Sequence, residues 1–153
     1  MNLILENSEY VDYYTYLDKL FLDIPKFQEL YWLISDIEYN FCSNSKLMAD
    51  PILIDGISLN KILQKENIQF IWGVFSGFSE KPKSVPKNIP YANNNPDFWK
   101  GSPNPQANGA EIEIVCWDST LTLFINTSEE IAEKLKTIYP DIKNLDEQNK
   151  LTL

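Results

Sequence analysis

The sequence contains no histidine and no arginine, and all 13 of its basic residues are lysines. Histidine is the commonest general acid or base near neutral pH and the commonest metal ligand, so its absence disfavours most catalytic mechanisms. Without arginine, the chain lacks the planar group that clamps phosphate with two hydrogen bonds. A phosphate loop and a dinucleotide-binding motif are also absent from the sequence. We therefore expect a protein that is not an enzyme.

Cysteine is scarce, and long apolar runs are absent. With no histidine beside them, Cys42 and Cys116 cannot form a zinc site of the Cys/His type. They could form one disulfide, but we expect two reduced thiols in a cytoplasmic protein. No apolar run approaches the length needed to cross a bilayer, and the first residues carry no basic segment. We therefore expect no membrane span and no signal peptide, and neither a metal nor a cofactor.

Aromatic residues and negative charge are abundant instead. The chain has 4 Trp, 8 Tyr and 8 Phe, a hydrophobic content of 44% and a net charge of −9. This composition is sufficient for a normal core, and the length predicts one domain over residues 1–153. The acidic charge disfavours contact with nucleic acid or an anionic membrane, and it favours a basic protein partner. Solubility alone would also explain the charge.

The spacing of apolar residues predicts the secondary structure. Helical spacing predicts a helix over residues 8–24, which Pro25 ends. Strands are predicted over 31–41, 50–56, 68–78, 110–117 and 120–126, and further helices over 59–66 and 127–139. These elements predict an α+β fold: a largely antiparallel sheet of four or five strands with about three helices packed on it. The polar tail from Asp141 is expected to fray.

Residues 79–108 differ from the rest of the chain, because they contain six prolines, six asparagines and four lysines. That composition excludes regular structure, and a loop of this length is usually functional or disordered. Aromatic residues in a loop either fold back onto the core, as we expect for Phe98, or contact a partner. Both alternatives are open for Tyr91 and Trp99. We take Tyr91, Asp97 and Trp99 as candidate partner contacts in this loop.

The predicted strand over residues 110–117 alternates between apolar residues and glutamates. Trp117 falls on the same face as Glu111 and Glu113, so it could be the apolar centre of an acidic patch that continues to Asp118. An aromatic anchor surrounded by charge is typical of protein interfaces. A helix covering that face would explain Trp117 equally well. These four residues complete the candidate partner-binding set.

A catalytic alternative rests on the same two glutamates. Glu111 and Glu113 would lie about 7 Å apart along the strand, a separation that suits a pair of carboxylates in glycoside hydrolysis. Alternating glutamates are also common on the solvent face of a half-buried strand. The carboxylate-dependent hydrolase is therefore the alternative to a binding protein.

The last third of the chain resembles a known family. Residues 110–125 combine a strand with alternating glutamates, an aromatic-Asp-Ser turn and a second strand; a capped helix and the sequence Tyr139-Pro140-Asp141 follow. This pattern is similar to the C-terminal part of small bacterial immunity-type proteins, which are found beside toxins of polymorphic or contact-dependent systems. The resemblance implies a cytoplasmic, non-catalytic protein that neutralises a cognate toxin by binding it tightly. It assigns no individual residue, because interface residues in such proteins vary with the toxin.

The sequence thus leaves three hypotheses. The first is an immunity-type binding protein whose partner is a basic toxin domain, with acidic residues that steer and aromatic residues that anchor. The second is the carboxylate-dependent hydrolase. The third is a structural module that associates with itself through an exposed sheet edge, and the choice between monomer and homodimer is open.

Overall fold

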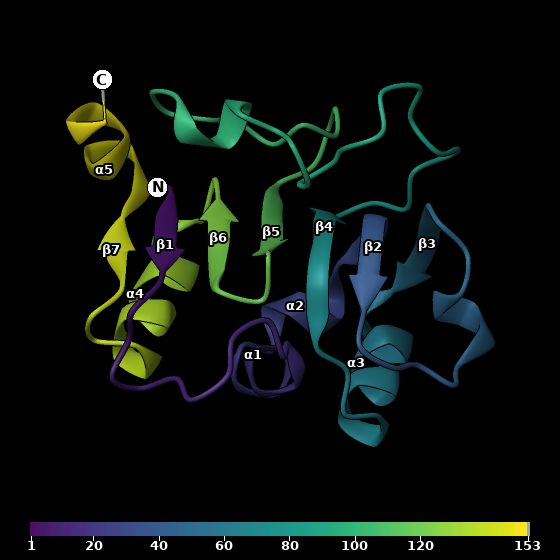
Figure 1. Ribbon diagram of the computed structural model, residues 1–153. Helices are drawn as coiled ribbons and strands as arrows, with labels where there is room; N and C mark the ends of the chain where they lie inside the picture. The colour runs from purple at the N-terminus through teal and green to yellow at the C-terminus, as the bar shows by residue number, and fades with distance from the viewer. Residues whose placement is uncertain (153) are drawn as a thin grey trace.

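A computed structural model describes residues 1–152, apart from the side chain of Ser45. Seven strands form one sheet in the order β3-β2-β4-β5-β6-β1-β7, and all neighbouring strands are antiparallel (Figure 1). The strands are β1 (Leu3–Leu5), β2 (Tyr31–Tyr39), β3 (Ile52–Asp55), β4 (Phe70–Phe78), β5 (Ile112–Trp117), β6 (Leu121–Ile125) and β7 (Lys143–Asn144). The α+β class and the antiparallel sheet are confirmed, but the predicted number of four or five strands is wrong.

The described part of the chain has five α-helices and two short 3-10 helices. The α-helices are α1 (Asp18–Asp23), α2 (Lys26–Glu29), α3 (Gly56–Lys65), α4 (Glu129–Ile138) and α5 (Leu145–Leu151). The 3-10 helices are η1 (Ser45–Leu47) and η2 (Asp97–Trp99). No helix among these residues combines the length and the apolar character that a membrane span needs.

The two additional strands lie at the end of the sheet where the chain termini meet. Leu3 of β1 pairs with Phe124 of β6 on one side and with Asn144 of β7 on the other. Short strands carry no readable alternation, and tertiary pairing alone stabilises them. The expectation of a frayed tail is wrong, because β7 leads into α5, where Leu145 and Asn149 are buried.

The helix predicted over residues 8–24 forms only in its last part. Thr15 has a φ of 66°, in the left-handed region that a helix cannot contain. The amide of Ser8 donates a hydrogen bond of 2.6 Å to the hydroxyl of Tyr14, so this segment folds as turns. Local side-chain bonds therefore replace the helix that the aromatic spacing predicted, and α1 begins at Asp18.

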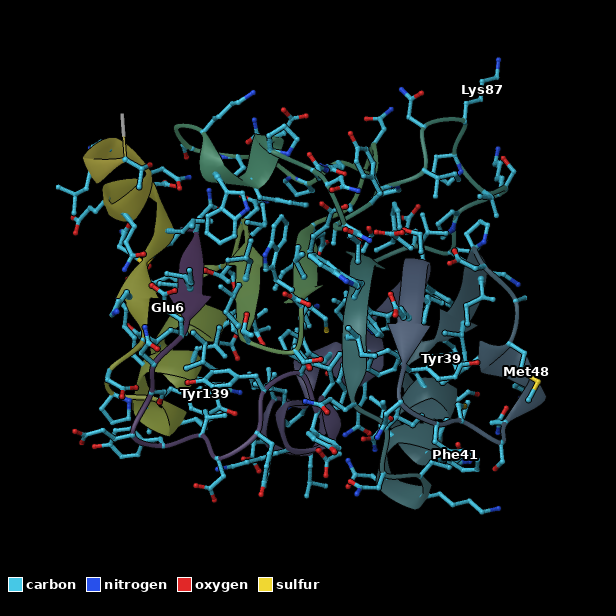
Figure 2. All side chains as sticks on the ribbon, in the orientation of Figure 1. Glu6, Tyr39, Phe41, Met48, Lys87 and Tyr139 are labelled. Atoms are coloured by element: carbon cyan, nitrogen blue, oxygen red, sulfur yellow. The ribbon has the colours of Figure 1, made fainter. Side chains whose placement is uncertain are left out.

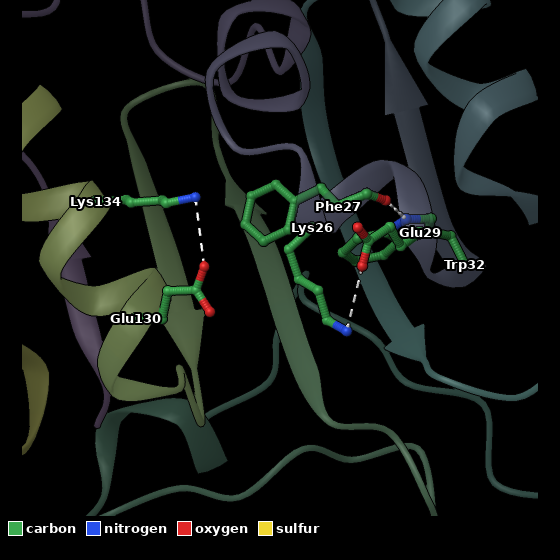
Figure 3. A network of polar contacts seen from close by, with 6 residues as sticks. All are labelled: Lys26, Phe27, Glu29, Trp32, Glu130 and Lys134. Atoms are coloured by element: carbon green, nitrogen blue, oxygen red, sulfur yellow. Dashed lines mark hydrogen bonds and ion pairs between the residues drawn. The ribbon is translucent and has the colours of Figure 1, made fainter.

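One face of the sheet is covered by α1 to α4, which lie along the bottom of the view in Figure 1. The buried Trp32 packs against Phe21 and Phe27, with ring centroids 5.3 and 5.7 Å away. Its indole N–H donates a hydrogen bond of 2.8 Å to the carbonyl of Phe27 (Figure 3). On the outside of the helix layer, Lys26 pairs with Glu29 and Lys134 pairs with Glu130. These exposed pairs add little stability, so aromatic packing holds this layer in place.

The other face of the sheet is covered by the segment between β4 and β5 and by α5. Leu33, Val74, Val115 and Leu123 point to this side and are fully buried. Figure 1 shows the covering segment crossing the upper end of the sheet towards α5. Its first part, residues 79–89, is largely exposed, whereas residues 90–107 pack on the sheet. We call residues 90–107 the anchored loop.

Candidate functional site

Glu113 of β5 holds one end of the anchored loop. Its side chain is fully buried and accepts hydrogen bonds from the amides of Gln106 (2.6 Å) and Ala107 (2.9 Å) and from the hydroxyl of Ser76 (2.6 Å). Burial raises the pKa of this carboxyl, and the three hydrogen bonds oppose that shift. The expectation that Glu113 lies on an exposed acidic surface is wrong, because the loop covers its face of the strand.

Asp36 of β2 holds the opposite end of the anchored loop. The register between β2 and β4 shifts after Ser35, and Asp36 has a φ of 54° there. Such a bulge redirects a side chain, and the Asp36 carboxylate accepts hydrogen bonds from the amides of Ala92 (2.8 Å) and Asn93 (2.9 Å). The hydroxyl of Ser35 donates to the carbonyl of Pro90 at 2.7 Å. This end of the loop is therefore fixed to the bulge of β2.

Three buried asparagines donate hydrogen bonds to backbone carbonyls of the loop between its two fixed ends. Asn95 donates to the carbonyl of Tyr91 at 2.7 Å, and its side-chain oxygen accepts from the amide of Asp97. Asn149 of α5 donates to the carbonyls of Phe98 and Gly101. Asn2, beside β1, donates to the carbonyl of Pro103 at 2.8 Å. The amide side chains thus replace the regular hydrogen bonds that a loop lacks.

The fold uses most of its buried polar side chains to fix this one loop. Nine polar or charged side chains are buried among the described residues, and six of them bond the loop directly or through Glu113. These six are Asn2, Ser35, Ser76, Asn95, Glu113 and Asn149. A surface loop held this firmly presents its outward side chains in one arrangement.

Three half-buried tryptophans, one from the loop and two from the sheet, form a cluster beside the loop. Trp117 of β5 packs edge-on against Trp72 of β4 and Trp99 of η2, with ring centroids 5.0 and 5.1 Å away. We call these residues the tryptophan cluster. Phe98, next to Trp99, is fully buried in the core beneath the loop, as expected. The 3-10 helix therefore directs Phe98 inward and sets Trp99 against Trp117 of β5.

The turn after β5 fixes the position of Trp117. Asp118 and Ser119 have φ angles of 49° and 55°, in the left-handed region, and the amide of Thr120 donates to the carbonyl of Trp117 at 3.0 Å to close a tight turn. The amide of Ser119 donates to the carbonyl of Ile71 at 3.0 Å, which ties the turn to β4 beside Trp72. The aromatic-Asp-Ser turn expected from the sequence is confirmed.

The structure divides the seven candidate residues into separate groups. Trp99 and Trp117 meet in the tryptophan cluster, and Tyr91 and Asp97 line one cavity of the loop. Glu111 and Asp118 are exposed, but they flank opposite ends of β5. A single acidic patch centred on Trp117 is therefore not formed, and the loop, not a helix, covers that face of the strand.

Sequence reasoning missed several residues that build this surface. Trp72 of β4 joins the tryptophan cluster, and Asp36, Asn95 and Asn149 fix the loop. A signal existed only for Asp36, which follows Ser35 in a strand whose other residues are mostly apolar. The asparagines were indistinguishable from ordinary loop and tail residues, because their partners are remote in the sequence.

The two carboxylates of the hydrolase hypothesis do not share an accessible site. Glu111 is exposed, whereas the carboxylate of Glu113 is buried and already accepts three hydrogen bonds. Within residues 1–152, no three carboxylate, thiol or imidazole side chains converge as a metal site requires.

The raised pKa of Glu113 predicts a pH-dependent contribution to stability. Between its ordinary value of 4.5 and the raised value, the folded state binds more protons, so this contribution falls as pH rises. Glu113→Gln removes the titration. We expect the unfolding free energy of wild type minus that of Glu113→Gln to be highest below about pH 4.5 and to fall as pH rises towards 7. Urea denaturation of both proteins across this range measures it, and a difference that grows with pH would contradict the assignment.

Comparison of the chain with protein-family models, with curated proteins and with solved structures finds no match.

Proposed function

We propose that this protein is a non-catalytic binding protein, which holds a basic protein partner on the outward side of the anchored loop and on the tryptophan cluster. The main support is that, among the described residues, six of the nine buried polar side chains fix that loop. Fixing a loop in advance lowers the entropy cost of binding. A loop that served only as cover for the sheet would not need to present Tyr91 and Trp99 at the surface.

The chemistry of this surface suits a protein interface. Half-buried tryptophans give large, rigid contact areas, and tryptophan and tyrosine are enriched among the residues that dominate binding energy. The net charge of −9 supports attraction of a basic partner, and Asp97 and Asp118 are exposed next to the cluster in the sequence. Charges of this kind mainly increase the association rate, while desolvated aromatics slow dissociation.

We further propose that the partner is a bacterial toxin domain and that the protein acts in the cytoplasm as its immunity protein. The support is the resemblance of residues 110–125 and of the helix that follows to immunity-type proteins. The hydrolase hypothesis is weakened by the burial of Glu113.

The proposal predicts which substitutions abolish partner binding. Wild type, Trp99→Ala, Trp117→Ala and Phe41→Ala are used as baits in lysate of the native host, and the retained proteins are quantified by mass spectrometry. Phe41 is the control, because it is 66% exposed and belongs to neither the anchored loop nor the tryptophan cluster (labelled in Figure 2). We expect a basic protein that wild type and Phe41→Ala retain and both tryptophan variants lose.

The kinetics with that protein provide the quantitative test. Trp99→Ala should increase the dissociation rate by a factor that corresponds to about 2 kcal/mol. Asp118→Lys, which reverses an exposed charge next to Trp117, should slow association and weaken its dependence on salt. Thermal denaturation shows whether each variant is folded. Retention of the partner by folded Trp99→Ala and Trp117→Ala variants would overturn the proposal.

A further inference from the structure

The anchored loop and the residues just before it enclose a cavity of about 330 Å³. Ile89, Pro90 and Pro103 give it apolar walls, the ring of Tyr91 lines it, and Asp97 and three amide side chains supply polar groups. The volume lies at the lower end of the range for ligand pockets. A single long side chain suits this space better than a folded segment.

The walls of the cavity are fixed by hydrogen bonds. The amide of Tyr91 donates to the side-chain oxygen of Gln106 at 3.2 Å, and the Tyr91 carbonyl accepts from Asn95. On the other wall, the carbonyl of Pro103 accepts from Asn2 at 2.8 Å. The cavity therefore exists before any partner arrives, which lowers the cost of filling it.

The charge of the cavity is negative. Among the described residues, Asp97 is the only charged one that lines it, and none of the lining residues is a lysine. Asp97 pairs with Lys100 at 3.7 Å, but their side chains are 70% and 67% exposed, so water screens this pair and the carboxylate can accept a second cation. Tyr91 is 45% exposed and adds an aromatic residue to the lining of the same cavity.

We propose that this cavity receives one arginine side chain of the protein partner, an inference that rests on the proposed function. The methylene groups of the arginine would pack on Ile89, Pro90 and Pro103. Its guanidinium would stack on Tyr91 and donate two hydrogen bonds to Asp97. Lysine fits less well, because its compact ammonium neither stacks nor forms a two-pronged contact.

The experiment uses the full chain and a defined probe. N-acetyl-arginine amide is titrated into isotope-labelled protein, and its neutral counterpart N-acetyl-citrulline amide is titrated in parallel. We expect saturable NMR shifts in residues 88–106 with a dissociation constant on the order of 1 mM for the arginine compound. Citrulline should bind at least about tenfold more weakly, which corresponds to one lost charge-assisted contact.

Two variants and two matched controls locate the contact. Asp97→Asn and Tyr91→Ala should each weaken arginine binding about tenfold or more. Asp12→Asn and Tyr13→Ala replace exposed residues of the same kinds outside the loop and should leave it unchanged. Equal binding of the citrulline compound, or of Nα-acetyl-lysine amide titrated in the same way, would overturn the inference, as would unchanged binding by Asp97→Asn. If these tests fail while the partner still depends on Trp99 and Trp117, only the arginine assignment is wrong.

Discussion

Replacing Glu113 by alanine is expected to destabilise the protein by about 3 kcal/mol or more. The substitution leaves the amides of Gln106 and Ala107 and the hydroxyl of Ser76 without their acceptor. Each buried polar group that loses its partner costs about 1–3 kcal/mol, and the loop can recover part of that cost by moving into water. We therefore expect both a lower unfolding free energy and a loosened anchored loop.

Two measurements separate these effects. Urea denaturation gives the loss of stability, and hydrogen exchange followed by mass spectrometry reports on the anchored loop. Exchange in residues 90–107 should accelerate more than exchange in β2 or β4. Glu111→Ala is the control, because that exposed residue precedes the same strand and its loss should change stability by less than about 0.5 kcal/mol. Equal effects of the two substitutions would show that Glu113 does not hold the loop.

The same substitution connects stability with binding. A loosened loop no longer presents Tyr91 and Trp99 in one arrangement, so part of the binding free energy would be spent on ordering it. We expect Glu113→Ala to weaken partner binding although Glu113 is buried and makes no outward contact.

Replacing Gly56 by alanine is expected to cost about 3 kcal/mol, the second large effect. A Cβ atom there would lie 2.5 Å from the carbonyl oxygen of Phe27 and 2.6 Å from that of Gln28. Both are backbone atoms, so no side chain can move aside. The amide of Gly56 also donates to the carbonyl of Leu30 at 2.8 Å, which fixes the start of α3 against α2. Overpacking against backbone must therefore shift one of the two helices.

Gly101→Ala provides the contrasting control for this prediction. Gly101 has a φ of 56° and no atom within 4 Å of an added Cβ, so alanine there causes backbone strain but no collision. We expect a cost of about 1 kcal/mol for Gly101→Ala. Thermal or urea denaturation of both variants measures the difference. A Gly56→Ala variant as stable as Gly101→Ala would show that the contact between α2 and α3 is loose.

The candidate site was only partly predictable, and Glu113 and Trp117 show why. Alternation correctly placed both on the face of β5 opposite Ile112 and Ile114. Alternation cannot reveal whether a face is open, because that depends on where a loop remote in the sequence packs. The anchored loop covers Glu113 completely and leaves Trp117 half-buried. For the same reason, the sequence does not reveal the roles of Asn95 and Asn149, because these depend on hydrogen-bond partners in the folded chain.

The sequence by itself determined the elements whose signal is local. The long apolar strand β4, the hairpin of β5 and β6 with its Asp118-Ser119 turn, and the Pro- and Asn-rich segment before it follow from side-chain period and turn chemistry. Only the tertiary structure decided the rest: pairing of β1 and β7, turns in place of helix before Asp18, and the packing of the loop on the second face. The physical reason is that the short strands and the polar side chains that bond the loop are stabilised only by partners remote in the sequence. The spacing of their own residues therefore shows no period that would predict those contacts.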